Sequence, residues 1–436
     1  MGMKQADVFR CLISEQAPIA FRGYDGSTAG PRDALATLEI RKPEAVRYVA
    51  TAPSDLGLAR AYVSGSLEVH GDLHAFLHSM VRDGRHDIPW SERLSILRGI
   101  GLRSLRRPEL PPEEAPPPWR RGRRHSKSRD AAAIAHHYDV SNRFYELVLG
   151  PSMAYTCAFF PSLDATLEQA QAAKFDLVCR KLALQPGQRL LDVGAGWGGM
   201  VIHAAENYGV QALGVTLSAP QAEWAQRAIA ERGLQDRAEV RFLDYRDVTE
   251  DGFDAVSSIG LTEHIGAKNL AGYFTFLAGK LRERGRMLNH TITRPNDLER
   301  HRAGPFIDRY VFPDGELEGP GTIVSAMHDN GLEVRHEENM REHYAMTLRE
   351  WGANLERNWE EAVQEAGERR ARVWRLYMAA SRVGFDLNRI ELHQVLGARL
   401  AEDGSSGLPL GVDWAPVRGE AELNGGPSRE PVGAAS

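Results

Sequence analysis

The chain has 436 residues, of which 42% are hydrophobic and 26% are charged, and its formal net charge at pH 7 is −6. This length predicts roughly two domains of an ordinary soluble protein, and so mild a charge gives no general argument for nucleic-acid binding. Three widely spaced cysteines, Cys11, Cys157 and Cys179, form no CxxC pair and no disulfide framework, which fits a reducing cytosol.

The N-terminus has no apolar signal-peptide core, and no run of about 18 apolar residues could cross a bilayer. We therefore expect a cytoplasmic protein that meets the inner face of a membrane only peripherally. Residues 1–103 should form a small mixed domain, because short strand-like and helix-like patterns there alternate with glycine breakers.

Residues 104–130 are expected to be a linker that is first proline-rich and then basic. The basic part, between Arg120 and Arg129, has two interpretations. It is either a solvated spacer or a patch attracted to an anionic membrane surface, where each Lys or Arg contributes about 1 kcal/mol.

Residues 131–401 predict one large α/β domain. The strand-like runs "RLLDVGAG", "VQALGVTLS", "AEVRFLDY", "FDAVSSIG" and "RMLNHTIT" alternate with helical stretches. This alternation is typical of βα units on a mostly parallel, Rossmann-like sheet. Residues 402–436 are rich in Gly, Pro and Ser and are expected to form a disordered tail.

The stretch "RLLDVGAGWGGM" predicts a ligand-binding loop. Its strand ends near Asp192, and Gly194, Gly196 and Gly198 then allow a tight turn and a close backbone approach to a ligand at a helix N-terminus. Two features favour S-adenosylmethionine (SAM) over NAD. The spacing differs from G-x-G-x-x-G, and an acid at the strand end could meet the ammonium or sulfonium of SAM.

The next two strand ends agree with SAM. Where NAD sites usually have an acid for the ribose, this chain has Thr216 and, five residues later, Gln221. After the third strand, Asp244 and Tyr245 could flank an adenine.

Nine motifs then make the sequence resemble the cyclopropane-fatty-acyl-phospholipid synthase family of SAM-dependent methyltransferases. In chain order they are "HYDVSNRFYELVLG", "MAYTCAFF", "LLDVGAGWGGM", "GVTLSAPQ", "LDYRDV", "GLTEHIGAKN", "LNHTIT", "FIDRYVFPDGEL" and "HYAMTLREW". The N-terminal residues resemble, more loosely, the lipid-handling domain of longer members of that family.

The resemblance implies two groups of site residues. The positions that match SAM-binding residues are Tyr155, Thr156, the glycine loop, Thr216, Gln221, Asp244, Tyr245 and Arg246. The positions that match the cluster holding a bicarbonate ion as base are Cys157, Glu263, His290, Ile292 and Tyr344. The implied substrate is a cis double bond in an acyl chain of a membrane phospholipid.

This chemistry explains the residue types. An alkene is a weak nucleophile, so much of the rate must come from holding it in line with the sulfonium methyl. The resulting carbocation needs a closed, apolar pocket that excludes water. Loss of a proton from the new methyl closes a cyclopropane, whereas a hydride shift before proton loss gives a methylene group. A small pinned anion can take the proton without trapping the cation.

The stretch "SSIGLTEHIGAKN" contains the neighbouring residues Glu263 and His264, which could also be metal ligands or buried structural residues. A metal site is disfavoured because Glu263 and His264 lack metal-ligand spacing and no other set converges. If the stretch is extended, His264 should point away from Glu263 and be structural. Cys157 lacks a neighbouring base and is read as a core thiol rather than a nucleophile.

Departures from the family pattern bear on the product. Thr262 and His393 stand where family members often carry aromatic residues, and loss of an aromatic near the cation could change its fate. The residues of the first two motifs resemble more closely the subgroup that makes 10-methylene fatty acyl chains. We therefore expect a methylene product and a separate reductase as a pathway partner. Homo-oligomerisation stays open.

Three alternatives remain. The first is cyclopropane formation on the same substrate. The second is a methyltransferase for a soluble small molecule. The third is a lipid-binding or nucleic-acid-binding protein with an inert SAM fold, which the intact glycine loop and the intact polar cluster argue against.

Overall fold

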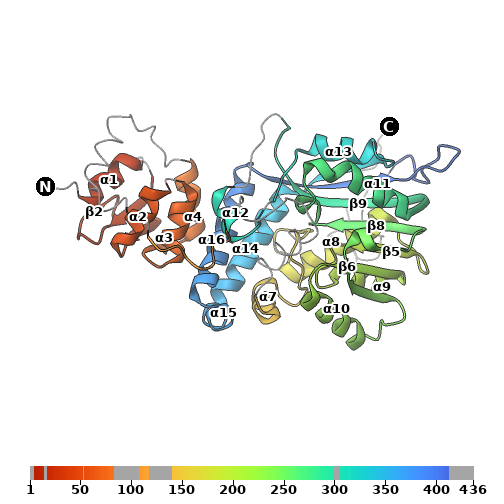
Figure 1. Cartoon of the computed structure of the whole chain (residues 1–436), viewed down its shortest axis with the longest axis horizontal. Helices are drawn as coiled ribbons and strands as arrows, with labels where there is room; N and C mark the ends of the chain where they lie inside the picture. Colours follow the sequence, from red (N-terminus) through yellow and green to blue (C-terminus); the bar gives the residue numbers. More distant parts are fainter. Residues whose placement is uncertain are drawn as a thin grey trace, which may run out of the picture.

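The computed structural model describes residues 4–13, 17–52, 54–82, 106, 108–116, 140–297, 304–313 and 315–411. The basic stretch between Arg120 and Arg129 therefore lies outside the described residues, as do residues 412–436 of the predicted tail. Figure 1 shows a small N-terminal unit at one end of the molecule and a larger α/β unit at the other, with long helices between them.

The N-terminal unit is a four-stranded mixed sheet in the order β2-β1-β3-β4, which confirms the expected small mixed domain. β1 pairs in parallel with β3, and the other neighbours are antiparallel. Its elements are α1 (Gln5–Leu12), β1 (Ile19–Arg22), β2 (Thr28–Ala29), β3 (Ala36–Ile40), α2 (Pro43–Thr51), α3 (Asp55–Val63), β4 (Leu67–Gly71) and α4 (Leu73–Arg82).

The larger unit is built on a seven-stranded sheet in the order β10-β11-β9-β8-β5-β6-β7. The five strands from β9 to β7 run in parallel, whereas β11 pairs antiparallel with β9 at one edge and β10 pairs antiparallel with β11. The predicted mostly parallel sheet is thus confirmed. The strands are β5 (Arg189–Val193), β6 (Gln211–Thr216), β7 (Ala238–Phe242), β8 (Phe253–Ile259), β9 (Leu281–Thr293), β10 (Glu333–Asn339) and β11 (Glu391–Ala398).

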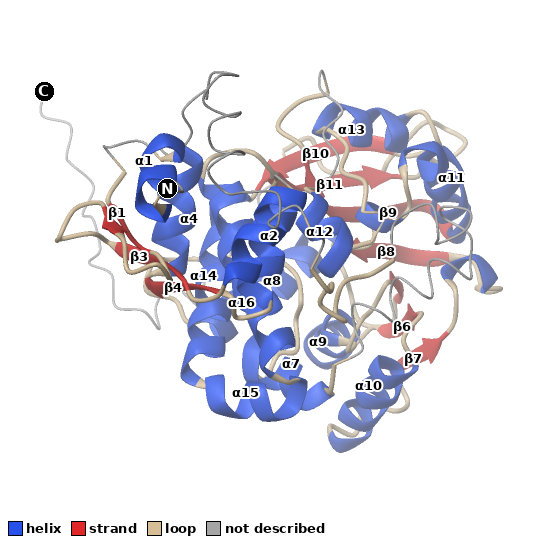
Figure 2. Ribbon diagram, turned by 60° about the vertical axis from the view of Figure 1, so that its left-hand side comes forward, coloured by secondary structure: helices blue, strands red, loops and turns tan. Residues whose placement is uncertain are grey.

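Helices cover both faces of this sheet because successive residues of a buried strand point to opposite sides. Leu190 packs in the layer of α8 (Leu167–Leu182), α9 (Gly199–Tyr208) and α10 (Ala219–Glu231). Leu191 packs in the opposite layer, with α11 (Leu270–Lys280) and α13 (Pro320–His328). Figure 2 shows these two layers on either side of the strands.

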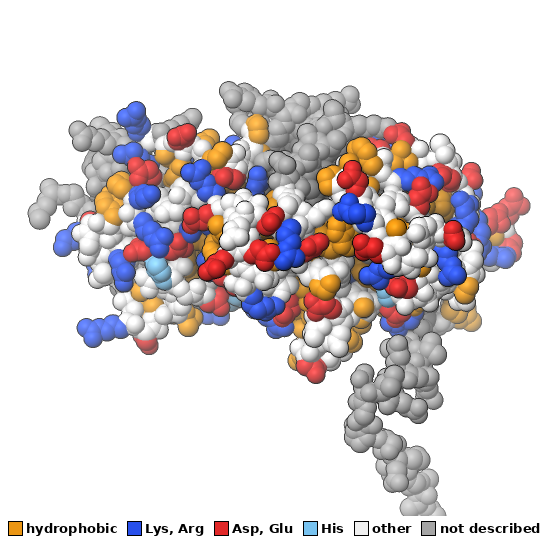
Figure 3. Space-filling model, turned by 90° about the horizontal axis from the view of Figure 1, so that it is seen from below, with side chains coloured by type: hydrophobic (Ala, Val, Ile, Leu, Met, Phe, Trp, Pro, Cys, Tyr) orange, Lys and Arg blue, Asp and Glu red, His pale blue; other side chains and the backbone are white. Residues whose placement is uncertain are grey.

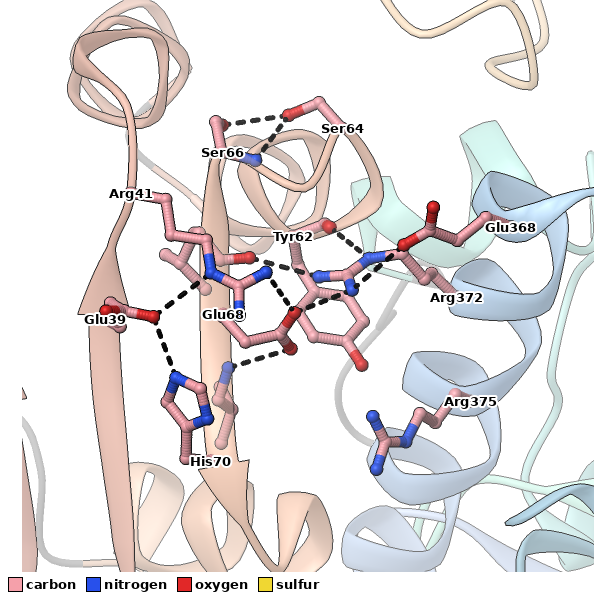
Figure 4. A network of polar contacts seen from close by, with 12 residues as sticks. Glu39, Arg41, Tyr62, Ser64, Ser66, Glu68, His70, Glu368, Arg372 and Arg375 are labelled. Carbon is pink, nitrogen blue, oxygen red and sulfur yellow. Dashed lines mark hydrogen bonds and ion pairs between the residues drawn. The ribbon is translucent and has the colours of Figure 1, made fainter. Parts of the chain in front are cut away.

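A third apolar cluster joins the N-terminal unit to the sheet unit. It involves α7 (Asn142–Leu149), α12 (Pro305–Tyr310), α14 (Arg341–Arg357), α15 (Trp359–Ala366) and α16 (Glu368–Asp386). Buried Arg372 of α16 donates hydrogen bonds to the Tyr62 and Leu67 carbonyls and pairs with Glu68 at 2.8 Å, as Figure 4 shows. These contacts hold the N-terminal sheet against α16.

Part of the expected linker is docked rather than solvated. Within residues 108–116, the Glu114 carboxylate is 1% exposed and pairs with Arg60 of α3 and Arg309 of α12. Tyr48 also donates a hydrogen bond to the Glu109 carbonyl. On the face drawn in Figure 3, acidic and basic side chains are interspersed, in keeping with the mild net charge.

Candidate active site

A cavity of about 730 Å³ lies between the sheet and the helices α14 and α16. At its polar end it brings together most of the residues that the resemblance implies, namely Tyr155, Thr156, Cys157, Glu263, His290, Ile292 and Tyr344. Its wall is apolar and includes Ile307, Phe312, Leu317, Leu348, Tyr377, Phe385, Ile390 and Leu392. The exposed lining residues Asn296, Asn388 and Arg389 mark its mouth.

The strand register explains why the polar residues converge. Ile259 at the end of β8 is in register with His290 on β9, so the turn after β8 begins beside His290. Gly260 has φ +73°, a left-handed value that suits glycine and redirects the chain. The short 3-10 helix Thr262–His264 then brings the Glu263 carboxyl back to β9, where Oε1 accepts a 2.6 Å hydrogen bond from the Ile292 N–H.

Glu263 has one anchored and one unsatisfied oxygen. The residue is 8% exposed, and Oε2 has no hydrogen-bond partner among the described residues. Burial raises the pKa of this carboxyl to about 7. Near neutral pH, Glu263 can therefore exchange a proton with a group bound in the cavity.

His290 is 1% exposed and presents an unsatisfied nitrogen. Its Nδ1 lies 3.1 Å from Gln394 Nε2, whereas Nε2 has no partner among the described residues. Burial and the nearby charges of Lys174 and Lys181 hold the pKa of His290 well below its usual value. The ring is therefore neutral at pH 7.

Cys157 and Tyr344 are buried as well, whereas Ile292 is half-buried. The Cys157 thiol donates to the Ala158 carbonyl at 3.2 Å, and burial raises its pKa, which argues against a thiolate nucleophile. Tyr344 is held by ring contacts with Phe385 and Trp351, at centroid distances of 4.6 and 6.1 Å. The side chains at this end are thus fixed by packing.

The glycine loop has the geometry of a ligand cradle. Gly194, Gly196 and Gly198 all have positive φ, at +78°, +55° and +79°. A Cβ on Gly196 would meet no protein atom within 4 Å, so the backbone is open there to a ligand. Gly198 immediately precedes α9, whose N-terminal N–H groups follow the loop.

The neighbouring strand ends add polar groups. Thr216 Oγ1 donates to Gln221 Oε1 at 2.8 Å, and the buried Gln221 Nε2 has no partner among the described residues. An unsatisfied donor beside an open glycine loop fits a polar ligand such as SAM. The Asp192 carboxyl accepts a 2.6 Å hydrogen bond from the Ser257 hydroxyl, which lies in register with it on the neighbouring strand β8.

The third strand end is also structured. Arg246 donates to both carboxylate oxygens of Asp244, at 2.8 and 2.6 Å, while the Tyr245 ring makes an edge contact with Tyr273. Tyr245 and Arg246 line a second cavity of about 380 Å³. His264 lines both this cavity and the large one.

The "GLTEHIG" stretch is not extended, which was the condition for the expected orientation of His264. His264 does not point away from the cavity lined by Glu263, because the stretch is a 3-10 helix and not an extended strand. Thr262 is not among the residues that line the large cavity, and its hydroxyl donates to Asn289 Oδ1 at 2.6 Å.

Three buried polar residues near the cavity were not predicted, namely Lys174, Lys181 and Gln394. Lys174 donates to Thr156 Oγ1 at 2.9 Å, and burial lowers its pKa to about 7. The sequence does hold a signal for the two lysines, because they fall on the same helical stripe as Leu167 and Val178, which faces the core. Gln394 stands inside an apolar strand, where a polar residue needs a partner.

Among the described residues, no group of three or more His, Cys, Asp or Glu side chains is placed to hold a metal ion. None of the helices within the described ranges is both long enough and apolar enough to cross a membrane.

Comparisons with known proteins identify a family for this chain. The model of the family described as mycolic acid cyclopropane synthetase matches residues 125–395. A probable fatty acid methyltransferase of Mycobacterium tuberculosis is 55% identical over 409 residues, which cover 92% of this chain and 96% of that protein. The cyclopropane-fatty-acyl-phospholipid synthase of Escherichia coli strain K12 is 32% identical over 377 residues, which cover 85% of this chain and 90% of that protein.

A solved structure of the same family is also similar to this chain. A mycolic acid cyclopropane synthase complexed with SAH and CTAB has a TM-score of 0.58 and 33% identity to this chain. The match covers 61% of this chain and 97% of that one.

Proposed function

The chain belongs to the mycolic acid cyclopropane synthetase family and is a SAM-dependent methyltransferase of lipid acyl chains, and we propose that it methylates the cis double bond of an unsaturated phospholipid. The observation that carries this proposal is the large cavity. It combines an apolar wall with two buried, unsatisfied groups, Glu263 Oε2 and His290 Nε2, at one end.

The apolar wall suits an acyl chain, and the mouth suits a headgroup. Glu391 at the start of β11 lies opposite Thr293 at the end of β9, so Arg389 lies just beyond this end of the strand pair. His290 lies on β9, three residues further inside the pair. At about 3.3 Å per residue, the four residues from His290 to Arg294 span about 13 Å. An exposed Arg389 at the mouth could therefore bind a phosphodiester while the chain reaches the polar end.

SAM, when bound at the glycine loop, would supply an electrophilic methyl group. The residues proposed to hold it are Tyr155, Thr156, Asp192, Gly194, Gly196, Gly198, Thr216, Gln221, Asp244, Tyr245 and Arg246. Tyr155 and Thr156, which are proposed to hold SAM, also line the large cavity. An alkene bound in that cavity would therefore lie next to the methyl group. Positioning of this kind accounts for much of the rate in a reaction with so weak a nucleophile.

A bicarbonate ion is proposed as the base that removes the proton from the cation. Glu263 Oε2 would accept a hydrogen bond from its hydroxyl, and His290 would donate one from Nε2. Tyr344 and the backbone beside Cys157 would complete the site, while the Ile292 N–H holds Glu263 in place. An acyl chain that fills the apolar part of the cavity would keep water from the cation.

The proposed product is a 10-methylene acyl chain, which a separate reductase would saturate. This proposal rests on the resemblance of the sequence motifs to the subgroup that makes 10-methylene chains, and two relatives at 55% and 40% identity are described as probable fatty acid methyltransferases. Cyclopropane formation is the second candidate, favoured by the name of the 32% identical relative.

The test of the base uses purified protein, SAM and vesicles of a monounsaturated phosphatidylglycerol in buffer stripped of carbon dioxide. We expect methyl transfer to be slow and to recover when bicarbonate is added. Full activity without bicarbonate would contradict the proposed base, and activity only on dispersed soluble substrates would contradict the proposed substrate.

A further inference from the structure

A row of polar side chains leads from the edge of the sheet to the large cavity. Glu338 on β10 is in register with Gln394 on β11, and Gln394 is in register with His290 on β9. Residues in register on neighbouring strands have their side chains on the same face and within contact distance. The exposed fraction falls from 34% for the Glu338 side chain to 0% for Gln394 and 1% for His290.

Lys181 of α8 completes this row. Its fully buried ammonium lies 2.5 Å from Glu338 Oε2 and donates to Gln394 Oε1 at 2.7 Å. An ammonium has donors and no acceptor. Gln394 must therefore turn its oxygen towards Lys181, which leaves its NH₂ group facing His290.

The orientation of Gln394 decides where the proton of His290 lies. Gln394 Nε2 donates to His290 Nδ1 at 3.1 Å, so Nδ1 is an acceptor and has no proton. A neutral imidazole has one N–H, which must then be on Nε2. That nitrogen has no partner among the described residues, and His290 lines the cavity.

We propose that Gln394, itself held by Lys181 and Glu338, is a positioning residue that fixes His290 as a neutral Nε2–H donor towards an anion in the cavity. The opposite tautomer would turn a lone pair towards that anion and repel it. The identity of the anion as bicarbonate rests on the proposed function, whereas the tautomer does not.

The groups that face His290 support a neutral ring. Lys174 and Lys181 of α8 lie close enough to disfavour a second positive charge, and burial acts in the same direction. Glu263 approaches from the turn after β8, and its Oε1 is bound to the Ile292 N–H. Glu338 is paired with Lys181.

The test is nitrogen NMR on the full chain labelled with ¹⁵N-histidine, with the His290 signals assigned by their loss in His290→Asn. We expect a protonated Nε2 and an unprotonated Nδ1 at neutral pH. In Gln394→Glu, a carboxylate oxygen would face Nδ1, so His290 should move its proton to Nδ1 or become an imidazolium. The control Gln226→Glu adds the same charge on α10 and should leave the His290 signals unchanged.

Kinetics provide the second readout. Gln394→Glu should lower kcat for methyl transfer at least tenfold and weaken the dependence on bicarbonate, with KM for SAM unchanged. The proposal is overturned if wild-type His290 has its proton on Nδ1, or if Gln394→Glu keeps both the tautomer and kcat. If bicarbonate proves unnecessary in the wild type, the proposed base fails while the NMR result still decides the role of Gln394.

Discussion

The backbone N–H of Ile292 donates a 2.6 Å hydrogen bond to Glu263 Oε1, and this contact ties the turn after β8 to strand β9. It leaves Oε2 buried and unsatisfied at the polar end of the cavity. Buried polar atoms in native proteins nearly always have partners, so an unsatisfied carboxylate oxygen and an unsatisfied histidine nitrogen on two residues that line the same cavity indicate a site for a small polar group.

Replacement of this carboxyl tests its role. Glu263→Gln keeps an oxygen for the Ile292 N–H but cannot take up a proton, so we expect kcat for methyl transfer to fall about a hundredfold or more. SAM binding measured by titration calorimetry should change little. Glu223→Gln, on the exposed side of α10, is the matched control and should keep full activity. Equal activity of Glu263→Gln and wild type would end the proposed role.

The same substitution predicts a pH-dependent change in stability. The pKa of Glu263 is raised to about 7 by burial, above its value of 4.5 in an unfolded chain. A raised carboxyl pKa favours folding below the unfolded pKa, and this contribution is lost as pH rises through 7. Glu263→Gln should thus match wild type near pH 5 and be more stable near pH 8, by at most about 3 kcal/mol.

Thermal unfolding at both pH values measures this difference in free energy. The Asp192 and Lys174 titrations are common to both proteins and should cancel. A constant difference between the two proteins across this range would show that Glu263 is not a buried, titrating carboxyl.

The glycine loop allows a controlled test of SAM binding. Gly196 and Gly233 both have positive φ, and a Cβ on either would meet no protein atom within 4 Å. Replacement of either glycine by alanine should lower the free energy of unfolding by about 1 kcal/mol. Only Gly196→Ala should weaken SAM binding, by tenfold or more in calorimetry. Similar SAM affinities of the two variants would show that the loop does not contact SAM.

The mouth of the cavity gives a prediction about the lipid. Arg389→Gln removes an exposed cation, so KM for phosphatidylglycerol vesicles should rise severalfold at low salt, while kcat and SAM affinity stay unchanged. Arg227→Gln, on the exposed side of α10, removes the same charge far from the mouth and is the control. Equal KM values for the two variants would mean that Arg389 does not bind the headgroup.

The sequence predicted the parts of this molecule that local patterns encode. The alternation of strands and helices, the glycine turn and the mixed N-terminal sheet all follow from hydrophobic period and turn residues. The pairing of Ile259 with His290, which assembles the polar end, depends on strand register and could be reached only through the family resemblance.

What the sequence missed depends on long-range contacts. Gln394 and Lys181 are 213 residues apart and meet only because the C-terminal end of α8 brings Lys181 to β11. Thr262 looked important beside Glu263, yet the 3-10 turn directs its hydroxyl to Asn289. The docking of residues 108–116 needed Arg60 and Arg309, which a local proline-rich pattern does not reveal.

The central claim is methyl transfer to a double bond of a phospholipid acyl chain. The most direct test is to express the full chain in a bacterial host rich in cis-monounsaturated phospholipid and to analyse the fatty-acid methyl esters by mass spectrometry and proton NMR, with Glu263→Gln as control. We predict a new ester heavier by one CH₂ unit with the NMR signals of an exocyclic methylene, absent from the control. Cyclopropane signals would contradict the proposed product, and an unchanged ester profile in cells that contain folded protein would contradict the central claim.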